Sequence, residues 1–185
     1  MPMKVFCCKW ILANIVGTTF GLAVIIALVI IVGSALTGVV GNAVGGGILG
    51  TTLGIMQWLL LRNMYQIDWW VFASMLGGAV GNAFGVEMLG TILGIMQWLL
   101  LREHIYRASW WVLATALGVT VGSAVGIDLV DIVIKIIVDA LGSDGAIPDI
   151  ANIVGFYTGV AVGSAIFGVI TGITLLFLSQ RTRLS

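Results

Sequence analysis

The chain consists of long apolar segments separated by short polar ones. The 52 residues 10–61 contain no charged side chain, and neither do the 31 residues 150–180. One α-helical crossing of a bilayer needs about 20 such residues. The first segment is therefore long enough for two crossings with a tight turn between them, and we expect an all-α integral membrane protein.

The apolar pattern is repeated along the chain. The segment that begins at Val80 matches the one that begins at Val40 at 18 of 23 positions, with an offset of 40 residues. A Trp with an Ala three residues later, followed by glycines four apart, recurs from Trp10, Trp70 and Trp111. The C-terminal GITLLFLSQR around Gly172 reads as a decayed copy of GIMQWLLLR. Such repeats predict three helical hairpins in one domain, at about 10–62, 66–104 and 108–181, and so about six transmembrane helices in a parallel internal repeat.

Composition supports the membrane assignment. Charged residues make up 9% of the chain, whereas soluble domains carry about 25%. Lys4 and Lys9 precede the first apolar segment as in a signal peptide, but that segment exceeds signal-peptide length and lacks a clear cleavage site, so we expect a retained span. Cys7 and Cys8 precede it and predict two reduced thiols, with lipidation as the alternative.

The distribution of charge predicts the orientation. Most basic residues lie at the termini or between the units: Lys4, Lys9, Arg62, Arg102, Arg107, Arg181 and Arg183. Most acids lie in the second turn or in the insert of the third unit: Glu87, Asp128, Asp131, Asp139, Asp144 and Asp149. Cytoplasmic loops are enriched in Lys and Arg. An even number of spans per unit places all of these basic residues on one side of the membrane, so we expect that side, with both termini, to be the cytoplasm.

All seven Trp residues lie close to a basic cluster: Trp10, Trp58, Trp69, Trp70, Trp98, Trp110 and Trp111. Amphipathic rings favour the headgroup zone. We therefore expect these side chains to form an interfacial belt on the cytoplasmic side alone.

Glycines at four-residue spacing are the dominant signal within the spans: Gly46, Gly50, Gly54, Gly77, Gly81, Gly85, Gly90, Gly94, Gly118, Gly122, Gly126, Gly155, Gly159 and Gly163. This spacing makes a flat groove in which a second helix can approach closely. Two uses stay open, namely packing between the two helices of one hairpin and a homo-oligomeric interface.

Six amide side chains lie within the apolar segments: Asn14, Asn42, Asn82, Asn152, Gln57 and Gln97. Interhelical hydrogen bonds of about 0.6 kcal/mol each are the first explanation, and a pore or pigment ligand is the less favoured one. Gln57 and Gln97 lie five residues before an Arg, where interfacial water can serve them. Gln97→Leu is therefore expected to leave assembly nearly intact.

The insert at about 127–141 carries Asp128, Asp131, Lys135 and Asp139 on a helical stripe about 80° wide. An amphipathic helix at the outer interface is the favoured interpretation. The rival is a stripe that lines an outer vestibule for cations.

The sequence shows no set of catalytic residues. His104 is the sole histidine and lies in a loop, and two adjacent cysteines do not make a metal site. We expect no enzyme activity, no cofactor, no metal and no nucleic-acid partner.

The motif GIMQWLLLR, followed by a loop, WWV and Ala-x-x-x-Gly, resembles a group of uncharacterised multi-span membrane proteins of cyanobacteria and related bacteria. The resemblance covers nearly the whole chain, although the third unit lacks the Gln–Trp pair. It implies a bacterial inner membrane, or a thylakoid membrane, and no particular activity.

Two functions remain. The first is a structural, accessory or assembly subunit that packs through its glycine faces with itself, as a homo-oligomer, or with a larger membrane complex. The alternative is an oligomeric passive channel or small transporter, lined by Asn14, Asn42 and Asn82 and fed by an acidic outer vestibule. Pigment binding is a distant third.

Overall fold

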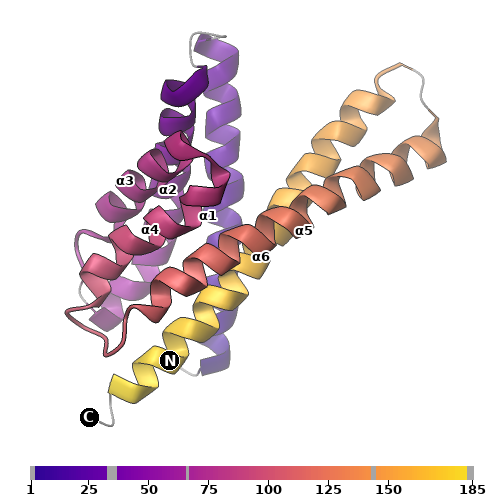
Figure 1. Ribbon diagram of the computed structural model, residues 1–185. Helices are drawn as coiled ribbons and strands as arrows, with labels where there is room; N and C mark the ends of the chain where they lie inside the picture. The colour runs from indigo at the N-terminus through magenta and orange to yellow at the C-terminus, as the bar shows by residue number, and fades with distance from the viewer. Residues whose placement is uncertain (1–2, 33–36, 66, 143–144, 183–185) are drawn as a thin grey trace.

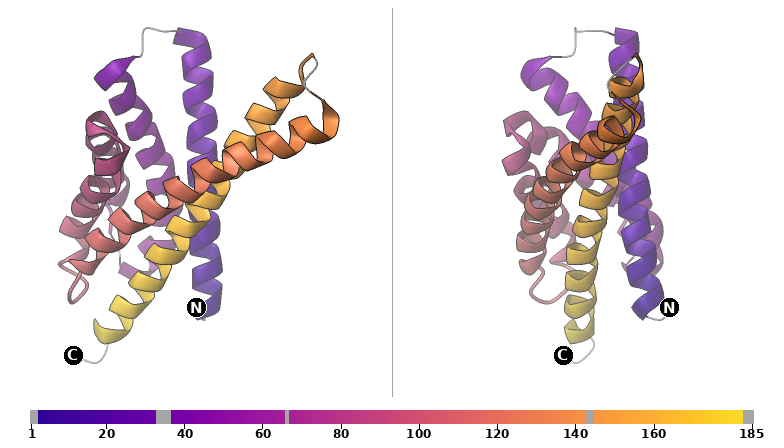
Figure 2. Two further views of the ribbon diagram at one scale, coloured as in Figure 1. Left: turned by 45° about the vertical axis from the view of Figure 1, so that its right-hand side comes forward. Right: turned by 90° about the vertical axis from the view of Figure 1, so that its right-hand side faces the viewer.

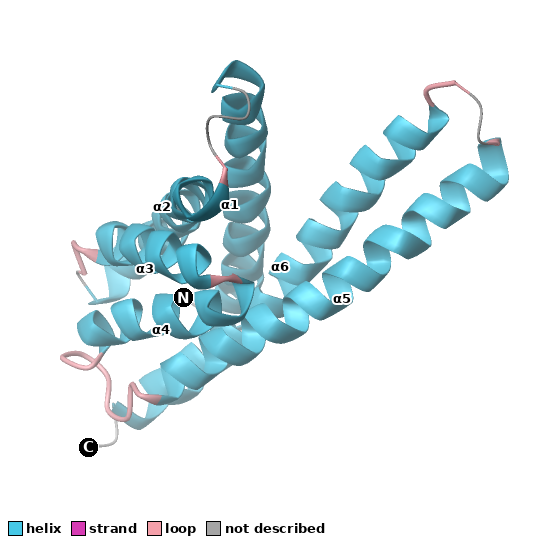
Figure 3. Ribbon diagram, turned by 45° about the horizontal axis from the view of Figure 1, so that its top comes forward, coloured by secondary structure: helices cyan, strands magenta, loops and turns pink. Residues whose placement is uncertain are grey.

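The computed structural model describes residues 3–32, 37–65, 67–142 and 145–182, so Asp144 and Arg183 of the charge pattern lie outside the described residues. The described chain contains helices and no strand (Figures 1 and 3), which confirms the all-α prediction. The helices are α1 (Met3–Val32), α2 (Gly38–Tyr65), α3 (Trp70–Phe84), α4 (Val86–Leu101), α5 (Trp110–Leu141) and α6 (Ile147–Thr182).

Glycine and proline determine where several helices end. Gly85 alone separates α3 from α4, and its φ of 113° is one that residues with a Cβ rarely adopt. Gly142, with a φ of 94°, caps α5, and Pro148 lies in the first turn of α6, where a missing N–H costs little. The two helices of the middle unit contain 15 and 16 residues. They begin at Trp70 and end at Leu101, inside the bounds 66 and 104 that the repeats predict for this unit.

The six helices of the described chain form a closed ring. Each helix packs against the next in chain order, and α6 packs against α1. Figure 2 shows both termini at one end, together with the α2–α3 and α4–α5 connections. Towards the opposite end, α5 and α6 diverge from the other four helices (Figure 1).

The even-numbered helices stack equivalent residues in layers one helical turn apart. The first layer is Leu53, Leu93 and Phe167, the second is Gln57, Gln97 and Thr171, and the third is Leu61, Leu101 and Leu175, and all nine are buried. Trp10, Trp70 and Trp111 of the odd-numbered helices lie buried among the third layer. The layers give the ring an approximate threefold arrangement.

This arrangement corrects the register of the third unit. Gly54, Gly94 and Gly168 are the glycines that pack on the residue four positions after a buried Trp, namely Ser74, Thr115 and Asn14. Gly168, and not Gly172, is therefore the structural equivalent of the glycine that opens GIMQWLLLR. An alignment by residue identity misplaces the third copy, because this unit keeps the helix contacts of the other two units but not their residue types.

Three helical segments are long and apolar enough to cross a membrane: Lys4–Val32, Gly38–Arg62 and Ile147–Ser179. Helices α3 and α4 are apolar but shorter. A membrane location is therefore supported by the length and composition of the described helices.

The spaced glycines face other helices of the same chain. A Cβ atom at Gly77 would lie 2.7 Å from Leu93 Cα, one at Gly90 would lie 2.7 Å from the Thr115 carbonyl oxygen, and one at Gly122 would lie 2.5 Å from that of Gly163. The same close approach holds at Gly46, Gly50, Gly54, Gly81, Gly94, Gly118, Gly126, Gly155 and Gly159. Gly85 is the exception, because it forms a turn. These glycines thus take part in packing between helices of the same chain.

Residues 127–141 continue α5 and do not form a separate helix. Nothing in this stretch breaks a helix, and a Cβ atom at Gly155 of α6 would lie 2.9 Å from Ile134, so the apolar side of the insert packs on α6. The four charged side chains of the stripe are exposed.

Replacement of Gly122 by Leu tests the glycine contacts. The new side chain meets the Gly163 backbone, and overpacking of this kind costs about 1–3 kcal/mol or more. We expect a corresponding loss in the free energy of unfolding, measured by circular dichroism during denaturation in detergent. Val121→Leu, on the exposed side of the same helix, is the control and should change little. Equal stability of the two variants would contradict the role given to Gly122.

Candidate functional site

Three tryptophan rings occupy the axis of the bundle near the end that holds the termini. Trp70 and Trp111 lie in the first turns of α3 and α5, Trp10 lies about two turns into α1, and all three are fully buried. The Trp111 ring lies edge-on to the other two, at centroid distances of 6.1 Å to Trp10 and 6.0 Å to Trp70. Phe6 stacks on Trp10 at 5.7 Å.

Each of these indoles donates its N–H to the polar residue of the preceding even-numbered helix in the ring. Trp70 Nε1 lies 3.1 Å from Gln57 Oε1, and Trp111 Nε1 lies 3.0 Å from Gln97 Oε1. Trp10 closes the series, because its Nε1 lies 3.0 Å from Thr171 Oγ1 on α6. Thr171 thus replaces the glutamine that the third unit lacks.

Each glutamine amide also donates a hydrogen bond to the odd-numbered helix that precedes it in the chain, and Gln97 donates a further one to Gln57 on α2. Gln57 Nε2 lies 2.9 Å from Asn14 Oδ1, and Gln97 Nε2 lies 2.9 Å from Ser74 Oγ and 3.3 Å from Gln57 Oε1. Thr171 has no amide to donate, and Thr115, at the equivalent position of the third unit, donates to its own helix, to the Trp111 carbonyl oxygen at 2.9 Å.

We call these groups the indole–amide cluster: Trp10, Trp70, Trp111, Asn14, Ser74, Thr115, Gln57, Gln97 and Thr171. Every member is essentially inaccessible to solvent and takes part in a hydrogen bond within the protein. No member carries a charge. Since an unpaired buried polar group costs about 1–3 kcal/mol, a fully paired cluster holds the six helices in one arrangement and blocks the axis at this level.

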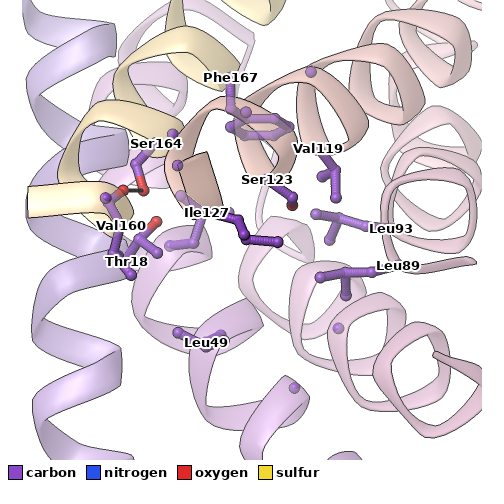
Figure 4. A pocket seen from close by; sticks show the side chains of 18 of the residues that line it. Thr18, Leu49, Leu89, Leu93, Val119, Ser123, Ile127, Val160, Ser164 and Phe167 are labelled. Atoms are coloured by element: carbon purple, nitrogen blue, oxygen red, sulfur yellow. Dashed lines mark hydrogen bonds between the residues drawn. The ribbon is translucent and has the colours of Figure 1, made fainter. Parts of the chain in front are cut away.

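A central chamber of about 320 Å³ lies on the other side of the Leu53, Leu93 and Phe167 layer. All six helices contribute to its wall, and Figure 4 shows Leu49, Leu89 and Val119 facing the space together with the hydroxyl-bearing Ser123. The wall contains no ionisable residue.

Two of the seven tryptophans of the predicted belt have exposed rings. Trp69 and Trp110 are 67% and 55% exposed. Trp58 and Trp98 are partly buried, with the guanidinium groups of Arg62 and Arg102 at 5.0 Å and 5.6 Å from their ring centroids. The interfacial assignment is wrong for Trp10, Trp70 and Trp111, which form the protein core. Neighbouring residues on a helix point about 100° apart, so each Trp–Trp doublet places one ring outside and one inside.

The expectation that water serves Gln57 and Gln97 is also wrong, because both are fully buried among tryptophans. Asn14 is likewise buried. Asn82 bonds α3 to α2 through the Asn42 carbonyl oxygen at 2.8 Å, whereas the side chains of Asn42 and Asn152 are exposed.

The proposed cation vestibule has no counterpart at the chamber. Ile127 and Val130 of the insert line the chamber, whereas its charged residues are exposed and contribute nothing to the wall. Among the described residues, no group of three His, Cys, Asp or Glu side chains could hold a metal ion.

Sequence reasoning missed Ser74, Thr115 and Thr171 as members of the cluster. A signal existed for the first two, because Asn14, Ser74 and Thr115 all stand four residues after the recurring Trp. A polar residue repeated at one position of an otherwise apolar helix predicts a buried partner. No comparable signal identified Thr171, since its register was lost.

A double-mutant cycle tests the cluster. Gln97→Leu leaves the Trp111 N–H without its acceptor. We therefore expect a loss of about 1–3 kcal/mol in the free energy of unfolding. The sequence alone had led to the opposite expectation. In a Trp111→Phe background the donor is absent, and the cost of Gln97→Leu should fall by about 1 kcal/mol or more. Reversible unfolding in mixed detergent gives the four stabilities. Equal costs in both backgrounds would refute the coupling.

No known protein family, curated protein or solved structure matches this chain, so the roles assigned to these residues rest on their geometry.

Proposed function

We propose that the chain is a non-enzymatic, six-span membrane protein of the bacterial inner membrane with a structural or accessory role. In this proposal each pair α1–α2, α3–α4 and α5–α6 forms a hairpin that crosses and returns. Helix α4 is about 24 Å long at 1.5 Å per residue, which is less than the usual hydrocarbon thickness of about 30 Å. Local thinning of the bilayer accommodates such short spans at modest cost.

The cytoplasmic assignment of both termini is supported by charge. Lys4, Lys9, Arg62 and Arg102 belong to the end that carries the termini and the two connections between units, whereas Glu87 follows the turn at the opposite end. Positive residues favour the cytoplasmic side. The exposed rings of Trp69 and Trp110 lie at the same end, as expected for the headgroup zone.

Labelling with a membrane-impermeant maleimide tests this orientation. Cys8 is exposed close to the N-terminus, and Glu87 is exposed at the other end. We expect Cys8, in a Cys7→Ser background, to react only in inverted membrane vesicles. Glu87→Cys in a background without other cysteines should react only in intact cells. Reaction of both residues from the same side would overturn the even number of spans per unit.

The indole–amide cluster is the observation that carries the structural role. A channel keeps polar groups open to a water path, and an enzyme keeps reactive groups open to a substrate. Here the buried amides and hydroxyls are hydrogen-bonded within the protein, and Asn14, a residue of the channel hypothesis, accepts a hydrogen bond from Gln57. The polar interior therefore serves the shape of the bundle.

Partners in this proposal contact the outer faces of the bundle. The glycine grooves are filled from within the chain. Exposed apolar side chains along α1, such as Leu12, Phe20 and Ile30, present an outer surface for lipid, for a second copy or for a larger complex.

Flux measurements separate this role from the channel alternative. Liposomes that contain the purified chain should retain K⁺, Na⁺ and protons as well as empty liposomes do, because the cluster closes the axis. Gramicidin added at the end provides the positive control. Flux that scales with the amount of protein, and that Gln97→Leu alters, would establish the channel instead.

A further inference from the structure

The central chamber exists because the third unit breaks the pattern of layers. One turn beyond Leu53, Leu93 and Phe167 the equivalent residues are Leu49, Leu89 and Gly163. The third side chain is missing because Gly163 lies against Gly122, where a Cβ atom would be 2.6 Å from the carbonyl oxygen. The close crossing of α5 and α6 thus leaves a space on the axis.

The wall of the chamber is chemically uniform. It consists of aliphatic side chains, two phenylalanines and glycine backbone, with Thr18, Ser123 and Ser164 as its hydroxyl groups. Apolar cavities in proteins take up apolar molecules in preference to water, so this mostly apolar lining favours an apolar occupant. Its volume of about 320 Å³ lies within the range of about 300–1,000 Å³ typical of ligand sites.

One side of the chamber is not sealed. Ile127 and Phe156 line the space and yet are 64% and 43% exposed. Ile127 belongs to α5 and Phe156 to α6, the two helices that diverge from the others (Figure 1). In a bilayer the surroundings of this side are lipid, so the molecule with direct access is a lipid chain.

Two hydroxyl groups add a polar feature. Ser164 donates to the Val160 carbonyl oxygen at 2.7 Å, as hydroxyls in spans usually do. The hydroxyl groups of Thr18 and Ser123 make no hydrogen bond to any described residue. They leave donors for a weak acceptor, such as the carbonyl oxygen of an ester.

We propose that the central chamber is a binding site for one acyl chain of a membrane lipid, which enters from the bilayer beside Ile127 and Phe156. The layer of Leu53, Leu93 and Phe167, with the indole–amide cluster behind it, forms the closed end of the chamber. It limits how deeply the acyl chain can enter. This site rests on the membrane location in the proposed function, but it does not require the structural or accessory role.

A filling variant and a matched surface variant test the site. Val160 lines the chamber, whereas Val169 on the same helix is exposed and is not part of the wall. Each is replaced by Phe in the full chain. The proteins are equilibrated with phosphatidylcholine vesicles whose acyl chains carry bromine as a mass label. They are then transferred to detergent and weighed by native mass spectrometry.

We expect one labelled lipid on the wild-type chain and on Val169→Phe. On Val160→Phe its retention should fall about tenfold, because the phenyl ring takes up space in the chamber that the acyl chain needs. Unfolding curves establish that both variants are folded. If Val160→Phe does not fold, Ser123→Leu fills the same space and takes its place.

Three results would overturn the proposal. They are wild-type protein without lipid, equal retention by the filling and surface variants, and an isoprenoid molecule in place of an acyl lipid on protein purified from native membranes.

Discussion

The hydrogen bonds between three indoles and three polar side chains are the constraint on which this structure depends. Hydrocarbon offers no water to a buried N–H, so each of these three indoles needs an acceptor inside the protein. The bonds from Trp70 to Gln57, from Trp111 to Gln97 and from Trp10 to Thr171 each join an odd-numbered helix to an even-numbered one. The repeat therefore specifies more than a set of spans, because it specifies which helix follows which around the ring.

Glycines make this geometry possible. The rings can reach their acceptors only if the helices lie close together, and a Cβ atom at Gly172 would lie 2.9 Å from the Trp10 ring. Where lipid offers no hydrophobic drive between helices, such close approach supplies the van der Waals contact that holds them. The large tryptophans at one end of the bundle and the glycines in the middle of the helices are thus two parts of one packing arrangement.

The sequence is informative about the helices and their repeats, and less so about which side chains point inward. The charge-free segments and the repeated motif led to an all-helical chain, and Gly85, Gly142 and Pro148 mark helix ends as such residues do. The Trp residues were misjudged because an indole suits both a headgroup zone and a hydrogen-bonded core. Periodicity can separate the rings of a doublet, but it cannot say which of the two faces the protein.

The remaining failures have a common origin in the third unit. Thr171 keeps a contact of Gln57 and Gln97 without their chemistry, so a comparison of letters misplaces the copy by four residues. The central chamber depends on Gly163 and on the divergence of α5 and α6, which are properties of helix crossing and not of local pattern. A residue that differs from its equivalents in the other units can therefore be interpreted only once the alignment of the three units is known.

Closure of the ring by Trp10 and Thr171 has a consequence for biosynthesis. The two residues are 161 positions apart, so at about 5–20 residues per second the second partner is made roughly 10–30 s after the first. During that interval the Trp10 indole N–H lacks its acceptor and α1 lacks its α6 neighbour. The nascent bundle is thus an incomplete ring until the last helix packs between α5 and α1.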